Sequence, residues 1–268
     1  MIRLDQALVE RGLCESREKA KRAIMAGTVK INGQLARKPS DAIKPNDELA
    51  VTEPEKFVSR GGHKLEHALE HFQLDVCGLT GIDLGASTGG FTDCLLQRGA
   101  ARVFAVDVGQ GQLAWKLRRD KRVVVMEKTN ARNVKPEDFT REVRSASASR
   151  AAGEGTSLPR PPSLAPADLV VIDCSFISLR KILPAAVALL RPSGNIVALI
   201  KPQFEAGKAE VDKGEGVITD PAIHDRVLRE LAEFVGGDPR LRWRGVTESP
   251  LLGPAGNKEF LVLIEKVG

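Results

Sequence analysis

The chain has 268 residues, of which 42% are hydrophobic, enough for one large domain with a buried core and a second, smaller domain. Its net charge of +5 is modest, but basic residues outnumber acidic ones in the first 64 positions, which favours an anionic partner there. No stretch approaches the roughly 18 consecutive apolar residues that span a bilayer, and the N-terminus is charged and amphipathic. We therefore expect a cytoplasmic protein that is neither secreted nor inserted in a membrane.

Residues 2 to 52 predict a small α+β domain. Helical patterns occur in "RLDQALVERG" and "SREKAKRAIMAG", and short strands are expected in "TVKING" and "DELAV". Ser16 is a suitable N-cap for the second helix, and Gly27 is placed to end it. Arg17, Lys21 and Arg22 gather toward one side of this helix, so we expect a basic helical face.

The segment "HKLEHALEH", residues 63–71, contains the pattern H-x-x-E-H twice, which raises the question of a zinc site. On a helical wheel His63, His67 and His71 lie within about 80° of one another and opposite the apolar residues. The only other histidine is His224, and no metalloprotease feature accompanies the pattern. We expect no metal here. Lys64, on the flank of the wheel, is the residue able to turn toward the next domain.

From about residue 80, short β-rich runs alternate with helical segments. Near-continuous apolar strands separated by helices are typical of a parallel sheet covered on both faces. The predicted strands are "TGIDLG", "RVFAVDV", "RVVVME", "ADLVVIDC", "GNIVALIK", "RWRGVTES" and "EFLVLIEK". The last two are close enough in sequence to form a hairpin. Residues 141–166 are rich in Ser, Ala, Pro, Gly and Arg, and we predict a disordered insertion there.

The loop "GIDLGASTGGFTD" follows the first of these strands and opens a helix. Its glycine spacing, G-x-x-x-G-G, differs from the G-x-G-x-x-G of dinucleotide-binding folds, which disfavours a dehydrogenase. Asp83 before the glycines, together with Asp107 at the end of the next strand, suits S-adenosylmethionine, because a carboxylate there can accept hydrogen bonds from both ribose hydroxyls. A tight strand-to-helix turn with an unrelated aspartate is the alternative.

Three ionisable residues stand at strand ends that should share one edge of the sheet. Asp173 and Lys201 end two strands, and Glu259 begins the last strand, which reaches the same edge if it runs antiparallel. Lys64 can cover that edge from outside. Two lysines and two carboxylates suit methyl transfer to a hydroxyl, where a lysine base needs a pKa lowered by burial and a second ammonium. Taken singly, each residue has a structural alternative.

With these motifs the chain resembles the TlyA family, also called hemolysin A, in which an S4 RNA-binding domain precedes an FtsJ-like 2′-O-ribose methyltransferase domain. The matching segments are "RLDQALVERGLCESREKAKRAIMAGTVKING", "SRGGHKLEHAL", "DLGASTGGFTD", "DCSFISL", "IKPQFEAG" and "GNKEFLV". The resemblance implies a Rossmann-like α/β methyltransferase sheet that uses S-adenosylmethionine, with a small α+β S4 domain. It implies an S4 part at 1–58, an interdomain segment at 59–79 and a methyltransferase domain at 80–268.

The resemblance also implies the site residues. The catalytic tetrad falls on Lys64, Asp173, Lys201 and Glu259, with Lys201 as the base. Cofactor binding carries over onto Asp83, Gly85, Ala86, Ser87, Thr88, Gly89, Gly90, Phe91 and Asp107. Thr129 or Asn130 in "EKTNAR" should edge the adenine. The substrate implied is a cytidine ribose hydroxyl of ribosomal RNA, with ribosomal RNA or ribosomal subunits as the partner.

The S4 part should bring several polar and basic residues toward an RNA phosphate backbone. They are Arg3, Ser16, Arg17, Lys21, Arg22, Lys30 and Asn32. With 4% aromatics and no tyrosine, recognition should rely on RNA shape and 2′-hydroxyls more than on base stacking. A solvated charged face is the alternative for this surface.

Other functions fit the sequence less well. Cys174 beside Asp173 raises the possibility of a covalent cytosine methyltransferase, but the partner motifs of that chemistry are absent, and the four dispersed cysteines are expected to be reduced. A pseudouridine synthase would need a G-R-L-D type motif after the S4 part. A membrane-active haemolysin would need a long amphipathic segment that the chain lacks, and a non-catalytic RNA-binding protein would not need the tetrad. The target nucleotide, the ribosomal subunit and the oligomeric state stay open.

Overall fold

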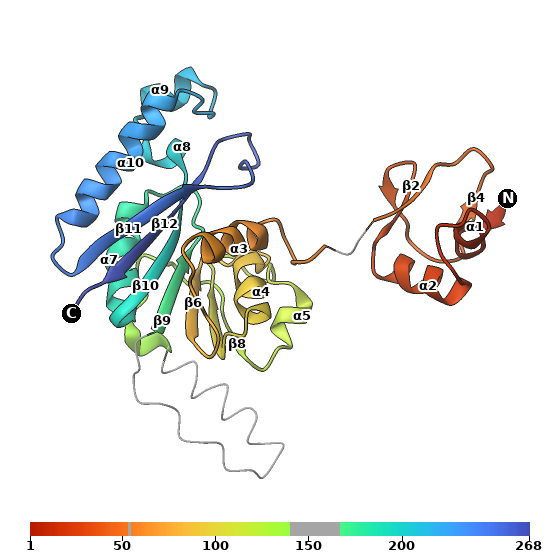
Figure 1. Ribbon diagram of the computed structural model, residues 1–268, viewed down its shortest axis with the longest axis horizontal. Coiled ribbons are helices and arrows are strands. Elements are labelled where there is room, and N and C mark those ends of the chain that lie inside the picture. The colour runs from red at the N-terminus through yellow and green to blue at the C-terminus, as the bar shows by residue number, and fades with distance from the viewer. Residues whose placement is uncertain (53–54, 140–166) are drawn as a thin grey trace, which may run out of the picture. The chain divides into compact units, whose positions relative to one another are not determined.

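The computed structural model describes residues 1–52, 55–139 and 167–268, which form two compact units, Met1–Lys56 and Phe57–Gly268 (Figure 1). The first unit ends two residues before the boundary predicted at residue 58. The insertion predicted at 141–166 lies outside the described residues. Within the described parts, no helix combines the length and apolar character needed to cross a membrane.

The first unit has two helices and two small sheets. Its helices are α1 (Leu4–Glu10) and α2 (Arg17–Met25), and its strands are β1 (Ile2–Arg3), β2 (Val29–Ile31), β3 (Gln34–Leu35), β4 (Ala42–Ile43) and β5 (Leu49–Val51). The sheet orders are β1-β4 and β3-β2-β5, all antiparallel. Leu4, Leu8, Ala20, Ile24 and Ile43 pack in its core. The predicted helices and the strands β2 and β5 are confirmed.

The second unit is built on a seven-stranded sheet in the order β11-β12-β10-β9-β6-β7-β8. The strands are β6 (Thr80–Leu84), β7 (Arg102–Val106), β8 (Val123–Met126), β9 (Ala167–Ile172), β10 (Leu190–Ile200), β11 (Leu241–Glu248) and β12 (Phe260–Lys266). Strands β6 to β10 are parallel, whereas β12 pairs antiparallel with both β10 and β11. All seven predicted strands and the terminal hairpin are confirmed.

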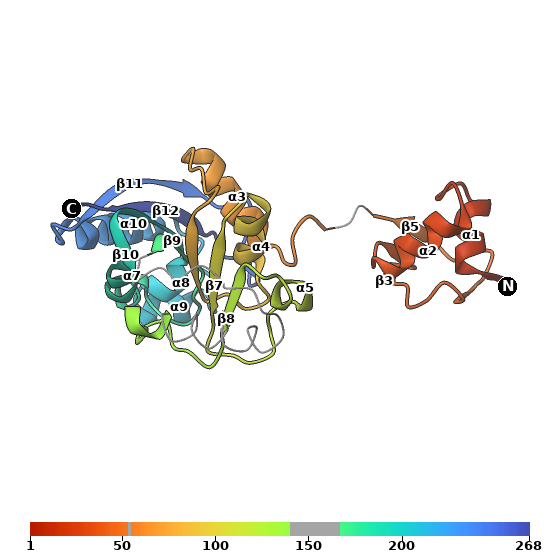
Figure 2. The same ribbon diagram turned by 90° about the horizontal axis from the view of Figure 1, so that it is seen from below.

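Helices cover both faces of this sheet (Figures 1 and 2). The helical elements of this unit include α3 (Gly61–His71), α4 (Gly90–Gln97), α5 (Trp115–Arg118), the 3₁₀ turn η1 (Leu179–Lys181), α7 (Leu183–Leu189), α8 (Pro202–Glu205), α9 (Lys208–Lys213) and α10 (Pro221–Gly236), of which α9 buries no residue. Alternate residues of the strands supply two cores: Val171 and Leu199 pack with α3, α4 and α5, while Ile172 and Ile200 pack with α7 and α10. This two-sided burial explains the near-continuous apolar runs in the sequence.

The topology places one crevice at the carboxyl edge of the sheet. From β6 the chain adds β7 and β8 on one side, and β9 then returns to the other side of β6. The loops after β6 and β9 therefore leave the sheet in opposite directions, and ligands of open α/β sheets bind at such a switch point.

Candidate active site

The glycine loop after β6 is pressed closely against neighbouring backbone. Gly85 has a φ of +89°, and a Cβ there would lie 2.6 Å from the carbonyl oxygen of Asp173. A Cβ at Gly90 would lie 2.3 Å from Oγ of Ser59 and 2.8 Å from the backbone nitrogen of Gly62. Glycine is therefore required at both positions, for conformation at the first and for space at both.

Asp83, the last residue but one of β6, is fully buried. Its Oδ2 accepts hydrogen bonds from the backbone nitrogen of Thr92 at 2.9 Å and from the Thr92 hydroxyl at 2.7 Å. Its Oδ1 has no hydrogen-bond partner among the described residues. Burial, and to a smaller degree the charge of Asp173, raise the pKa of Asp83 to about 7. A cationic group placed at the free oxygen would favour the ionised carboxylate and lower this pKa again.

Asp107 follows β7 and ties two loops together. Its Oδ2 accepts from the backbone nitrogen of Ser87 at 2.8 Å, and its Oδ1 accepts from that of Gly109 at 2.7 Å. Asn130 is exposed, and its Oδ1 accepts from the backbone nitrogen of Arg132 at 3.0 Å. The hydroxyl of Thr129 donates to the carbonyl of Glu127. The ribose and adenine roles expected for these residues stay predictions.

A pocket of about 280 Å³ opens beside the glycine loop. Its lining includes Lys64, Asp83, Gly85, Ala86, Ser87, Thr88, Gly90, Phe91, Asp173, Lys201 and Glu259. The structure thus brings all four tetrad positions and most of the cofactor positions together, although the sequence placed them up to 195 residues apart. Gly89 instead lies against α5, where a Cβ would come within 2.3 Å of Leu117.

Lys64 and Glu259 form one ion pair of the pocket, with 2.5 Å between Nζ and Oε2. Lys64 lies in the first turn of α3, and its side chain is 9% exposed, while that of Glu259 is 1% exposed. Glu259 precedes β12, so the antiparallel direction of that strand carries it to the carboxyl edge of its parallel neighbours. Oε1 of Glu259 has no hydrogen-bond partner among the described residues.

Lys201 and Asp173 form the second pair, with 2.6 Å between Nζ and Oδ1. The Lys201 amine also donates to the hydroxyl of Ser175 at 2.8 Å. Lys201 follows β10 directly, and the pairing of Ile200 with Phe260 sets Lys201 beside Glu259 at the sheet edge. Two lysines and two carboxylates therefore converge on one pocket.

The pocket also contains residues that our sequence reasoning did not assign to the site. They are Ser59, Arg60, Gly61, Ser175 and Pro254. Four of these, Ser59, Arg60, Gly61 and Ser175, lie within the quoted motifs "SRGGHKLEHAL" and "DCSFISL", so motif position was the available signal. Pro254 precedes Glu259 by five residues in an irregular loop that has no periodicity to read.

The histidines and Cys174 have other contacts. Nε2 of His67 lies 3.2 Å from the hydroxyl of Thr247, and the rings of His63 and Phe57 meet edge to face at 5.0 Å. The Cys174 thiol donates to the carbonyl of Leu84 at 3.4 Å, and burial raises its pKa to about 12. A thiol that resists ionisation is a poor nucleophile, so a covalent cysteine mechanism is disfavoured.

Several of the predicted RNA-binding residues of the first unit are engaged in local contacts. Arg3 and Arg17 both pair with buried Asp5, at 3.0 and 2.9 Å, and these bonds, first that of Arg3, lower the pKa of Asp5 to about 2. About half of each arginine side chain stays exposed. Ser16 caps α2 by accepting from the backbone nitrogen of Lys19.

The remaining positions lie on α2 and on the hairpin that begins with β2. Lys21 pairs with Glu18 at 2.7 Å, and Arg22 is exposed on the same helix. The side chain of Asn32 donates to Asp47 at 3.0 Å and accepts from the backbone nitrogen of Glu48 at 2.8 Å, with a φ of 51°. Lys30 is half-buried in β2. RNA contact by these residues stays a prediction.

Comparison with known proteins identifies both units. Residues 57–266 match the family model described as FtsJ-like methyltransferase, and residues 2–49 match the S4 domain. The 16S/23S rRNA (cytidine-2′-O)-methyltransferase TlyA of Mycobacterium tuberculosis is 46% identical over 264 residues, covering 97% of this chain and 88% of that protein. Hemolysin A of Brachyspira hyodysenteriae is 39% identical over 260 residues, covering 97% and 98%.

A solved structure of a candidate hemolysin from Streptococcus thermophilus is also similar. It shares 42% sequence identity, with a TM-score of 0.69, over 99% of this chain and 88% of that one. Sequence relatives, family models and this structure agree over both units. The chain therefore belongs to the TlyA (hemolysin A) family, in which an S4 domain precedes an FtsJ-like methyltransferase domain.

Proposed function

We propose that this protein transfers a methyl group from S-adenosylmethionine to the 2′-hydroxyl of a cytidine in ribosomal RNA. The observation that carries the proposal is the convergence of two lysine–carboxylate pairs, Lys64 with Glu259 and Lys201 with Asp173, on the pocket beside the glycine loop. The relative from M. tuberculosis, named for this reaction, supports the choice of cytidine and of ribosomal RNA. We infer from such a substrate that the protein acts in the cytoplasm.

The residues of the pocket fit S-adenosylmethionine. Gly85 and Gly90 leave no room for a side chain and so let a ligand approach the backbone closely. The unpartnered Oδ1 of Asp83 suits the ammonium group of the methionine part. When bound, the cofactor supplies a methyl sulfonium, which is already a strong electrophile. The protein must then orient the hydroxyl and take up its proton.

Lys201 is the residue we assign to proton removal. Its amine donates a hydrogen bond to Ser175 and lies 2.6 Å from Oδ1 of Asp173 in an ion pair. These two contacts hold the amine at the pocket, where its neutral form can accept the proton of the 2′-hydroxyl. The buried pair of Lys64 and Glu259 lies beside it and positions the ribose.

The first unit is proposed to bind the RNA. Half-exposed Arg3 and Arg17, held by Asp5, present fixed cationic groups, and exposed Arg22 adds a third on α2. Lysine and arginine contacts to phosphates supply sequence-independent affinity, while the reaction pocket selects the nucleotide. We propose ribosomal subunits or their RNA as the partner.

The proposal is tested with purified protein, labelled S-adenosylmethionine and ribosomal subunits from cells that lack this gene. Nuclease digestion followed by mass spectrometry should identify 2′-O-methylcytidine. Lys201→Ala should abolish transfer while cofactor affinity stays within about threefold, because Lys201 acts on the hydroxyl. Lys208→Ala, which alters an exposed lysine of α9, is the matched control. Wild-type activity in Lys201→Ala would remove Lys201 as the base.

A further inference from the structure

Two segments that leave the sheet from adjacent strands run alongside each other. Residues 173–179 follow β9, and residues 201–205 follow β10. At the pocket end, the Lys201 amine contacts Asp173 and Ser175. One step further along, the rings of Phe176 and Phe204 lie 5.2 Å apart. The reacting amine and its carboxylate are therefore held by the alignment of two segments outside the sheet, the loop after β9 and α8, and not by the sheet alone.

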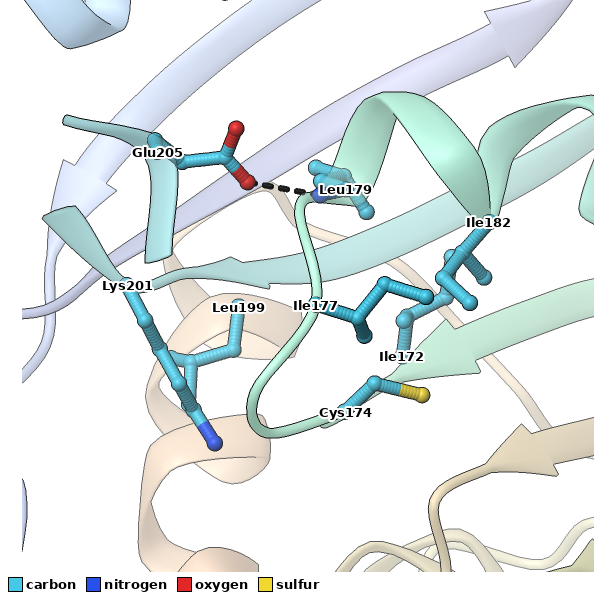
Figure 3. A pocket seen from close by; sticks show the side chains of 8 residues that line it. All are labelled: Ile172, Cys174, Ile177, Leu179, Ile182, Leu199, Lys201 and Glu205. Carbon is cyan, nitrogen blue, oxygen red and sulfur yellow. Dashed lines mark hydrogen bonds between the residues drawn. The ribbon is translucent and has the colours of Figure 1, made fainter. Parts of the chain in front are cut away.

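Glu205 closes the far end of this alignment. Its Oε1 accepts from the backbone nitrogen of Leu179 at 2.6 Å, and its Oε2 accepts from the hydroxyl of Ser178 at 2.7 Å. Figure 3 shows the carboxylate facing the turn at Leu179, whereas the amine of Lys201 points away from Glu205. Glu205 therefore acts on the loop that carries Asp173 and not on the amine.

A carboxylate in this place is energetically expensive. Glu205 lines a cavity of about 10 Å³ whose other walls include Ile172, Ile177 and Ile182, and burial raises the pKa of Glu205 above its usual value. It forms no ion pair in the described part of the chain, and the nearby Arg180 pairs with Glu230 at 3.0 Å. An apolar residue would fill the space without the free-energy cost of removing a carboxylate from water. The contribution specific to the carboxylate is therefore its two hydrogen bonds, to Ser178 and Leu179.

We propose that Glu205 is a positioning residue, which sets the distance between Asp173 and Lys201 by fastening the turn at Ser178 and Leu179 to α8. The inference rests on the function proposed above. A displacement of about 1 Å in a reacting group can reduce turnover about a hundredfold. Loss of the fastening should therefore lower kcat while the cofactor pocket, which is lined by other residues, keeps its affinity.

The test compares Glu205→Ala with Glu205→Gln in the full chain. For Glu205→Ala we expect kcat to fall about a hundredfold, with the Kd for S-adenosylmethionine within about threefold of wild type. Glu205→Gln should retain kcat within about threefold, because the amide oxygen accepts from Leu179 and the amide nitrogen donates to Ser178. A loss in Glu205→Gln as large as in Glu205→Ala would overturn the proposal in favour of a role for the charge.

Hydrogen exchange gives a readout independent of activity. The Leu179 amide should exchange at least about tenfold faster in Glu205→Ala and at the wild-type rate in Glu205→Gln. Unchanged exchange or unchanged kcat in Glu205→Ala would overturn the proposal. If Glu205→Ala does not fold, Ser178→Ala serves instead, because it removes one of the two hydrogen bonds that Glu205 accepts. This variant should lower kcat about threefold to tenfold. Full activity in Ser178→Ala would overturn the proposal.

Glu230→Gln is the matched control, because Glu230 reaches η1 through the side chain of Arg180 without touching the loop backbone. It should leave kcat and Leu179 exchange unchanged, and a loss like that of Glu205→Ala would overturn the assignment to Glu205. Failure of the proposed function would give a different result. The wild-type protein would then methylate no RNA, whereas the Leu179 amide would still exchange faster in Glu205→Ala than in wild type.

Discussion

Asp83→Asn should raise the stability of the methyltransferase unit and lower its affinity for the cofactor. Asp83 is fully buried, and its pKa is raised from 3.8 to about 7, first by burial. Because the folded state holds its proton up to about pH 7, the ionised carboxylate opposes folding. Three pKa units correspond to about 4 kcal/mol as an upper bound on this effect.

The sign of the pH dependence follows from proton binding. Between about pH 4 and pH 7 the folded chain holds a proton on Asp83 that the unfolded chain has released, so wild-type stability falls as the pH rises. Above about pH 7 both states are ionised and the effect is constant. Asp83→Asn lacks this titration, and its amide oxygen can still accept from Thr92. Relative to wild type, the variant should therefore gain stability up to about pH 7, by about 1 to 3 kcal/mol once its unpaired amide is included.

Urea unfolding at several pH values between 4.5 and 8, followed by tryptophan fluorescence, measures this difference. Both tryptophans, Trp115 and Trp243, lie in the second unit, so the signal reports that unit alone. Cofactor affinity should fall about tenfold to a hundredfold, because the variant loses a charged acceptor for the ammonium. A stability difference that does not change with pH would refute the reasoning. Asp238→Asn is the control with opposite sign, since the hydrogen bond from Arg240 lowers the pKa of Asp238 to about 2.

Two further outcomes are expected. Lys64→Met should destabilise the second unit by about 3 to 5 kcal/mol in urea unfolding, because it leaves buried Glu259 without its cation. Lys64→Met combined with Glu259→Gln should recover part of this loss. Unchanged stability in the Lys64→Met variant would contradict the burial argument. Deletion of residues 1–56, the first unit, should weaken RNA binding in a filter assay and spare cofactor binding. Unchanged RNA affinity at physiological salt would argue against an RNA-binding role for the first unit.

The large sheet could be predicted because each strand is buried on both faces and leaves a continuous apolar run in the sequence. Strands β1, β3 and β4 have two residues each, too few to show any periodicity, and were not predicted. Only β4 contributes a core residue, Ile43, while both residues of β1 and of β3 are exposed, so these strands leave no apolar pattern in the local sequence.

In the candidate site, too, residues at strand ends could be predicted and contacts made outside the strands could not. Asp173, Lys201 and Glu259 could be grouped from sequence, because strand ends and strand direction determine which residues share an edge. Contacts made by irregular segments could not be anticipated. The bond from Lys201 to Ser175 joins residues 26 positions apart, and Glu205 meets Leu179 across the same separation. Neither loop has a repeat that would place one beside the other.

The two ion pairs differ in a way that bears on which lysine reacts. The Lys64 and Glu259 side chains are 9% and 1% exposed, so this pair is almost fully enclosed. Lys201 is 11% exposed, little more than Lys64, but its partner Asp173 is 26% exposed, and the third member of that cluster, Ser175, is exposed. A proton taken from a substrate must eventually reach solvent, and Asp173 and Ser175 give the second pair the more open route. Enclosure also makes separation of the first pair costly, because each charge would be left buried alone. Burial therefore favours Lys201 as the group that exchanges protons and Lys64 as the fixed cation that orients Glu259 and the substrate.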